Sequence, residues 1–207
     1  MHLDSTIQTS SDGSHTVISK MYDVPYHSRH GAISESEVVF IDAGLNYQHA
    51  NELKLVKVFE MGFGTGLNVL LAYQWARKHN IKIDFQTIEA FPLDKEIFNS
   101  FHSVEWNKNI EINDSFTFSK YLSKIESFVF PTSFDVIFYD AFAPSSQPEL
   151  WDPIAMKNMY EILNPYGVLV SYCAQGAFKR NLKSAGFNIE SLPGPPGKRE
   201  MTRAIKL

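Results

Sequence analysis

The stretch VFEMGFGTGLNVLLAYQWA, residues 58–76, decides the fold. An apolar run meets three glycines at alternate positions, Gly62, Gly64 and Gly66, and the chain then continues with apolar residues at helical spacing. Because glycine has no Cβ, these positions allow a sharp turn and a close approach of the backbone to a ligand. The stretch therefore predicts a strand, a bare turn and a helix, with a nucleotide-like ligand at the turn.

Strand and helix patterns alternate after residue 50. Runs typical of buried strands occupy 55–61, 82–90, 110–114, 134–142, 167–173, 188–192 and 199–207, and helical periodicity covers 67–80, 92–102, 151–163 and 176–187. This order predicts an α/β, Rossmann-like domain over 51–207, with a mostly parallel sheet of seven strands and helices on both faces. Strand patterns at 15–22 and 34–45 predict a short β/loop extension over 1–50, packed on the same domain.

The composition is that of a globular protein. Apolar residues make up 44% and charged residues 20% of the 207 residues, and no apolar run approaches the roughly 20 residues of a membrane span. The polar start contains no signal-peptide core, so we expect a cytoplasmic protein without membrane contact. Cys173 is the only cysteine, which excludes an internal disulfide. His27 and His30 have no carboxylate at metal-binding spacing, and we expect no metal.

Charge is unevenly distributed along the chain. The formal net charge of −4 argues weakly against indiscriminate nucleic-acid binding. From residue 177 onward, however, seven basic and two acidic residues give +5, against −9 for the rest. Two interpretations stay open for this basic segment: a solvated surface, or a local contact surface for phosphates.

Acidic residues accompany the glycine turn. Ligands of open α/β sheets bind at the carboxyl ends of the strands, where Glu60, Glu89 and Asp114 are expected. The third glycine comes one residue too early for the dinucleotide pattern G-x-G-x-x-G, and Glu60 would repel a pyrophosphate. A carboxylate there suits the ammonium and sulfonium groups of S-adenosylmethionine. Glu89 is placed to accept from ribose hydroxyls and Asp114 from the adenine amino group, so we predict this cofactor.

Asp140 ends the apolar strand at 134–142 and opens a loop rich in proline and aromatic residues. In class I methyltransferases this position faces the transferable methyl group, which makes Asp140 the candidate catalytic residue. Phe142 and Pro144 are predicted to form a rigid wall that orients a flat substrate, with a base stacked on an aromatic face. Packing of the loop on the following helix is the competing interpretation, above all for Trp151.

Four motifs together resemble one family. FEMGFGTGLN at 59–68, DAFAPSSQPELW at 140–151, GAFKRNLKSAGF at 176–187 and GKREM at 197–201 are similar to the methyltransferase half of the bifunctional tRNA 5-methylaminomethyl-2-thiouridine biosynthesis (MnmC) family. The likeness covers residues 22–205. It implies transfer of a methyl group from S-adenosylmethionine to the amine of 5-aminomethyl-2-thiouridine, at the wobble position in the tRNA anticodon loop.

The resemblance also implies roles for individual residues. On matching positions Gly62, Gly64, Gly66 and Glu89 would hold the cofactor, with Asp114 at the adenine end. We predict that Glu60, Thr65 and Asn68 complete the cofactor-binding set. Asp140 would orient the reacting amine as an acceptor, with proton acceptance as a second role. Lys198 and Arg199 would contact phosphates of the anticodon stem. The family's flavin-dependent oxidase half has no counterpart in these 207 residues, so a separate enzyme is expected to supply the aminomethyl base.

Three other functions stay open. A class I methyltransferase for a small-molecule amine would act without tRNA. A nicotinamide-dependent oxidoreductase is disfavoured by Glu60 and by Leu67, which stands where the dinucleotide pattern has its third glycine. A non-catalytic RNA-binding module would tolerate the loss of Asp140.

Overall fold

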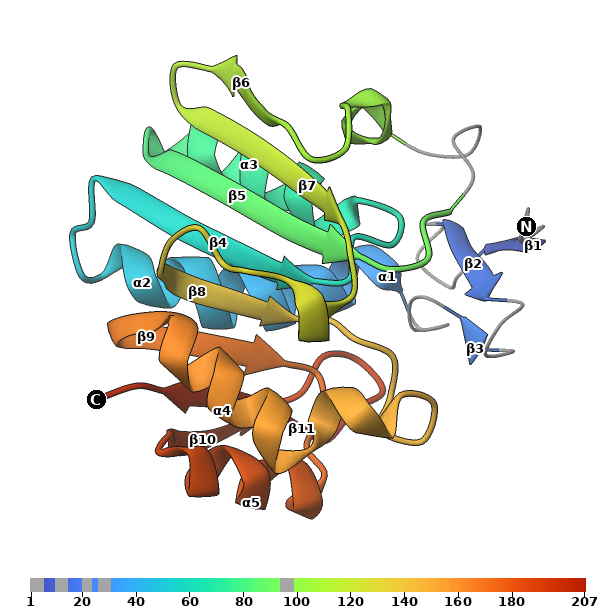
Figure 1. The fold of residues 1–207 in the computed structure, drawn as a ribbon, viewed down its shortest axis with the longest axis vertical. Helices are drawn as coiled ribbons and strands as arrows, with labels where there is room; N and C mark the ends of the chain where they lie inside the picture. The colour runs from blue at the N-terminus through green and yellow to red at the C-terminus, as the bar shows by residue number, and fades with distance from the viewer. Residues whose placement is uncertain (1–5, 10–14, 20–23, 26–30, 94–98) are drawn as a thin grey trace.

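The computed structural model describes residues 6–9, 15–19, 24–25, 31–93 and 99–207. An α/β sheet with helices on both faces forms its centre (Figure 1). In the described part of the chain this sheet has eight strands: β4 (Leu55–Met61), β5 (Lys82–Glu89), β6 (Asn109–Asn113), β7 (Phe116–Leu122), β8 (Phe134–Tyr139), β9 (Leu163–Ser171), β10 (Asn188–Pro193) and β11 (Glu200–Ile205). The connections include α3 (Leu67–His79), α4 (Pro153–Ile162), α5 (Gly176–Ala185) and the 3-10 turns η3 (Ser100–Ser103), η4 (Ile125–Ser127) and η5 (Pro148–Trp151).

The central strands of this sheet are parallel. Their order is β10-β11-β9-β8-β4-β5-β7-β6, and among these described strands only β6 and β11 run against the others. Met61, the last residue of β4, pairs with Ile88 of β5 and with Tyr139 of β8. The carboxyl ends of the central strands therefore lie at one edge, where a ligand is expected. The predicted Rossmann-like, mostly parallel sheet is confirmed.

The prediction of a parallel strand ending at Asp114 is wrong. β6 runs antiparallel to β7, and Asp114 lies exposed in the turn between them. The side chain of Asn113 accepts from the backbone N–H of Ser115 at 2.9 Å, an Asx turn that reverses the chain. The third parallel position belongs to β7, which the sequence pattern did not reveal, so the described sheet has eight strands rather than seven. Asp114 consequently sits at the amino edge, opposite the ligand edge.

The predicted strand at 34–45 is also wrong, because this stretch is helical. α1 (Ala32–Ser36), the π-helical segment η1 (Glu37–Asn46) and α2 (Tyr47–His49) follow one another without a break. Short apolar runs do not by themselves distinguish a buried helix from a strand. Gly44 brings the helix close to the sheet, since a Cβ there would lie 3.2 Å from side-chain carbons of Phe138 and Val136. We call residues 32–49 the N-terminal helical segment.

The described parts of the first 25 residues form a separate small sheet. β1 (Thr6–Thr9), β2 (His15–Ser19) and β3 (Val24–Pro25) pair antiparallel in that order. The strand expected at 15–22 is thus present over its described residues 15–19. Of the helix expected at 92–102, residues 94–98 lie outside the described residues, as do His27 and His30. Residues 92–93 are not helical, and the end of this stretch forms the 3-10 turn η3 rather than an α-helix. Nowhere in the described ranges is a helix long and apolar enough to cross a membrane.

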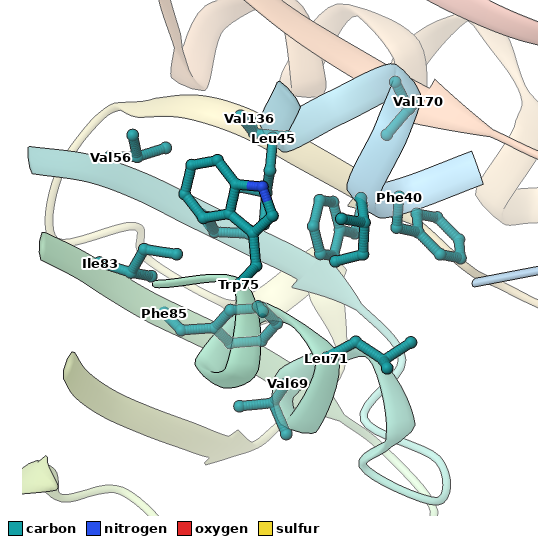
Figure 2. Close-up of a cluster of buried hydrophobic side chains, with 14 of the residues drawn as sticks. Phe40, Leu45, Val56, Val69, Leu71, Trp75, Ile83, Phe85, Val136 and Val170 are labelled. Carbon is teal, nitrogen blue, oxygen red and sulfur yellow. The ribbon is translucent and has the colours of Figure 1, made fainter. Parts of the chain in front are cut away.

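Two apolar cores lie on the two faces of the sheet. α4 and α5 cover one face, and α3 with the N-terminal helical segment covers the other. Figure 2 shows Leu45 of that segment beside Trp75 of α3, and the ring centre of Phe40 lies 5.1 Å from that of Phe138 in β8. The indole of Trp75 donates to Asn46 Oδ1 at 2.6 Å. The segment is therefore part of the main core.

Replacing Leu45 tests this packing. Leu45 is fully buried, so Leu45→Ala should lower the free energy of unfolding by about 2–5 kcal/mol, as measured by urea denaturation. Leu55→Ala is the matched control, because Leu55 is 42% exposed and its loss should cost well under half as much. Equal effects of the two changes would show that the segment does not seal the core.

Candidate active site

The glycine turn between β4 and α3 adopts a backbone that side chains disfavour. Gly62, Gly64 and Gly66 have φ angles of 92°, 49° and 69°, in the left-handed region where glycine is preferred. The N–H of Gly62 donates to the carbonyl of Ile88 at 3.1 Å, and a Cβ on Gly62 would lie 3.3 Å from the backbone oxygen of Asp140. The turn is thus wedged between the ends of β5 and β8.

Glu89, the last residue of β5, braces the glycine turn. Its carboxylate accepts from the backbone N–H of Gly64 at 3.2 Å and from that of Phe91 at 2.9 Å. Burial raises the pKa of Glu89, and these backbone donors hold the increase down. The side chain therefore couples the turn to the neighbouring strand, and it also lines a cavity at this edge.

The cavity measures about 440 Å³ and opens at the carboxyl ends of β4, β5, β7 and β8. This size suits a small-molecule ligand or cofactor. Several predicted residues line it: Gly62, Gly64, Thr65, Asn68, Glu89, Asp140, Phe142 and Lys198. Most of the site residues predicted from the sequence therefore lie together at this cavity. Gly66 caps α3 just behind the wall, where its carbonyl accepts from Asn99 Nδ2 at 2.9 Å.

Asp140 is held in the cavity wall by Asn68. Asn68 Nδ2 donates to Asp140 Oδ2 at 2.8 Å. Burial raises the pKa of the Asp140 carboxyl to about 8; the charge of Glu35 also raises it, whereas Asn68 and Lys198 lower it. The site therefore contains a carboxyl with an unusually high proton affinity, and groups of this kind cluster at functional sites.

Glu60 lies behind the turn rather than in the cavity wall. It is 1% exposed. Burial, reinforced by the charge of Asp140, raises the pKa of Glu60 well above its usual range, whereas hydrogen bonding to the nearby side chains of Thr87 and Asn68 lowers it. Glu60, Glu89 and Asp140 thus form an acidic group that a cation in the cavity would stabilise. The carboxylates of Glu89 and Asp140, which line the cavity, fit the predicted ligand, since S-adenosylmethionine carries an ammonium and a sulfonium group.

Besides Glu60 and Gly66, three more predicted residues lie outside the cavity wall that the described residues form. Asp114 is at the opposite edge of the sheet, so its prediction as an adenine contact is wrong; Ser123 and Lys124, after β7, line the cavity instead. Pro144 lies within the turn after Ala143 and is absent from that wall. Arg199 is exposed on the outer surface.

The loop after Asp140 packs as well as lining the cavity. Trp151 is 4% exposed, lies against Phe178 and Tyr139, and donates its indole N–H to the carbonyl of Phe142 at 2.8 Å. The packing interpretation of Trp151 is therefore the right one. Phe142, which this bond holds in place, reaches the cavity.

Two further lining residues with polar side chains, Glu35 and Tyr172, were also not predicted from the sequence. Glu35 comes from α1, where a strand was expected, and Tyr172 follows β9. The hydroxyl of Tyr172 donates to the carbonyl of Ala141 at 2.8 Å. Glu35 could have been found only if residues 32–49 had been predicted to be helical. For Tyr172, its position near the end of the strand predicted at 167–173 was the signal.

Three of the seven basic side chains of the C-terminal segment pair with acidic neighbours, and Lys206 donates to the backbone carbonyls of Tyr160 and Leu163. Lys179 pairs with Glu200, Lys198 with Glu35, and Arg203 with Glu190. By contrast, no ion pair to the exposed residues Arg180, Lys183 or Arg199 is found within the described ranges. Of the two interpretations of this segment, a phosphate-binding surface is therefore restricted to these three side chains.

A parallel sheet with a bare turn, a cavity beyond its carboxyl edge and an acidic wall defines a class I S-adenosylmethionine-dependent methyltransferase. Consistent with this, a family model described as S-adenosyl-L-methionine-dependent methyltransferase matches residues 85–207, and the chain belongs to this family. Glu89 and the glycine turn are the residues that would hold the cofactor.

Individual relatives are more specific. The chain is 28% identical over 214 residues to the tRNA 5-methylaminomethyl-2-thiouridine biosynthesis bifunctional protein MnmC of Leptospira interrogans, over 90% of this chain and 33% of that protein. The MnmC of Ralstonia nicotianae is 28% identical over 96% of this chain and 34% of its own length. The chain thus spans about a third of these curated relatives. The crystal structure of MNMC2 from Aquifex aeolicus superposes with a TM-score of 0.81 and 27% identity, over 97% of this chain and 70% of that one.

Glu89 and Asp114 provide a matched pair for cofactor binding. Glu89→Gln replaces an acceptor oxygen by an amide that cannot serve both backbone donors, and it should weaken binding of the cofactor's demethylated product by about 10–100-fold, or about 1.4–2.8 kcal/mol. Isothermal titration calorimetry measures this. Asp114→Asn, at the other edge of the sheet, should leave the dissociation constant unchanged. A comparable loss in both variants would contradict the assigned site.

Proposed function

We propose that this chain methylates the primary amine of 5-aminomethyl-(2-thio)uridine at the wobble position of tRNA, giving 5-methylaminomethyl-(2-thio)uridine. The observation that carries the proposal is Asp140: a carboxyl of high proton affinity in the wall of an acidic cavity, directly beside the cofactor-binding turn. An amine is the nucleophile that such a wall binds best. The names of the MnmC relatives and the likeness to the Aquifex structure support the tRNA substrate.

The protein's part in the reaction is to bind, orient and deprotonate the amine. When bound, S-adenosylmethionine supplies an electrophilic methyl group for which a neutral amine is the nucleophile. Oδ2 of Asp140 already accepts a hydrogen bond from Asn68. We infer that Oδ1 accepts a hydrogen bond from the substrate amine. Holding the nitrogen in one orientation provides much of the acceleration available to such a displacement.

Asp140 also suits the second role expected of it. An alkylammonium has a pKa of roughly 10, so transfer of its proton to an ordinary carboxylate with a pKa near 4 is strongly uphill. The pKa of Asp140, raised to about 8 by burial, reduces this difference. The proton leaves the ammonium nitrogen, the carboxylate accepts it, and the nitrogen lone pair is released for attack.

Only one nucleotide of the RNA, the wobble nucleotide, enters the cavity. A wobble base lies in a loop and can be turned out without melting a duplex. Phe142 offers it an apolar wall. The exposed Arg180, Lys183 and Arg199 are the candidates for phosphate contact. A cytoplasmic location and a separate enzyme that supplies the aminomethyl base complete the proposal.

The decisive experiment uses labelled S-adenosylmethionine and tRNA bearing 5-aminomethyluridine, followed by nucleoside analysis. We expect the label on the amine, as 5-methylaminomethyluridine. Asp140→Asn should lower kcat by about 100-fold or more, whereas the matched Asp114→Asn variant should retain full activity. Label elsewhere in the tRNA, or none, would overturn the proposal. Equal activity on the free nucleoside would favour the small-molecule alternative.

Arg199 tests the RNA surface separately. Arg199→Glu should weaken tRNA binding and reduce the slope of log K against log salt by about 1 or more, because at least one phosphate contact is lost. Lys82→Glu makes the same charge change at the amino end of β5, at the far edge of the sheet, and should have little effect. Filter binding over a range of salt concentrations gives both slopes. Identical slopes for the two variants and the wild type would remove Arg199 from the interface.

A further inference from the structure

Lys198 does not extend into solvent, although the sequence suggested a phosphate contact. Its Nζ lies 4.1 Å from the centre of the Tyr172 ring and forms an ion pair with Glu35. The Lys198 side chain is 34% exposed and that of Glu35 is 13% exposed. Both residues line the same cavity as Asp140. A primary alkylammonium group is therefore held at the cavity wall between an aromatic face and a carboxylate.

We propose that Glu35 and Tyr172 form, together with Asp140, the subsite for the substrate's amino group, and that the Lys198 ammonium occupies this subsite until substrate displaces it. This inference rests on the proposed function, because it takes the substrate to be an amine. It assigns two specificity-determining residues, Glu35 and Tyr172, to the same reaction.

The chemistry of the occupant supports the assignment. The end of a lysine side chain is a CH₂–NH₃⁺ group, the same group that an aminomethyl substituent presents. An aromatic face within about 6 Å of a cation attracts it, and a partly desolvated carboxylate adds a charge-assisted hydrogen bond. A site that holds one alkylammonium in this way has the shape and charge to hold another.

The surroundings fix the subsite and leave its occupant replaceable. The hydroxyl of Tyr172 donates to the carbonyl of Ala141, next to Asp140, which fixes the ring. Burial is the main reason that the pKa of Asp140 is raised, but Glu35 raises it and Lys198 lowers it, so these charges act on one another. The backbone of Lys198 is fixed by its N–H bond to the carbonyl of Pro195 at 2.9 Å, whereas its four-carbon side chain can rotate away.

Removing the internal cation should expose the subsite. We expect Lys198→Met to bind ethylammonium at least tenfold more tightly than the wild type, as measured by ligand-observed NMR titration of ethylamine hydrochloride. The matched control is Lys124→Met, which removes another lysine from the cavity lining. This variant should bind ethylammonium no more tightly than the wild type. Adding Glu35→Gln or Tyr172→Leu to Lys198→Met should abolish the gain. Equal affinities in the wild type and Lys198→Met would overturn the proposal.

A second measurement separates recognition of the amine from support of the fold. Wild-type protein saturated with the demethylated cofactor should bind 5-aminomethyluridine at least tenfold more tightly than 5-hydroxymethyluridine, a neutral analogue of similar shape. Glu35→Gln should reduce this ratio of affinities to about threefold or less, mainly because 5-aminomethyluridine binds more weakly. If the substitution lowers the affinity for both nucleosides equally, Glu35 has only a structural role and the inference fails. If the wild type methylates no amine in tRNA, the proposed function fails, while the ethylammonium result still decides the subsite.

Discussion

The whole site depends on one steric constraint, the wedging of a left-handed glycine turn between two parallel strands. A Cβ at Gly62 would stand 3.3 Å from the backbone oxygen of Asp140, on a backbone with φ of 92°. The strand that ends at Tyr139 can therefore run close beside β4, and Asp140 emerges directly next to the turn. Glu89 fixes the other side by accepting from Gly64 and Phe91. The same close approach therefore sets the position of the glycine turn and of the Asp140 carboxyl.

Burial of carboxyl groups is the second determinant of the chemistry. Asp140 lies in the cavity wall and Glu60 behind the turn, and burial raises the pKa of each. Such an arrangement is unfavourable for an empty, fully ionised site and becomes favourable when cations enter it. In the free protein Lys198 supplies part of this compensation through Glu35. The proposed affinity for cationic ligands and the internal ion pair thus have one physical origin.

Local patterns in the sequence were sufficient for the elements with long, regular periodicity. β4 (Leu55–Met61), the glycine turn and α3 (Leu67–His79) agree closely with the prediction, because the turn chemistry and the change from strand to helix are both explicit there. Short apolar runs were less informative: 34–45 has β-branched residues but forms a buried helix. Asp114 was misplaced for another reason, since a strand pattern does not reveal its direction and the Asx turn at Asn113 reverses the chain. With β7 (Phe116–Leu122) unrecognised, Ser123 and Lys124 were missed at the cavity.

The position of β4 in the sheet has a consequence for how this molecule can be divided. β4 hydrogen-bonds to β5 on one side and to β8 on the other, yet it lies upstream of residues 85–207, the region that the family model matches. A fragment limited to that region would lose the strand that joins the two halves of the sheet, along with the glycine turn. In such a fragment, β5 and β8 would each expose an edge of unpaired backbone N–H and C=O groups. Edges of this kind favour self-association over folding. The autonomous folding unit is therefore larger than the region by which the family is recognised.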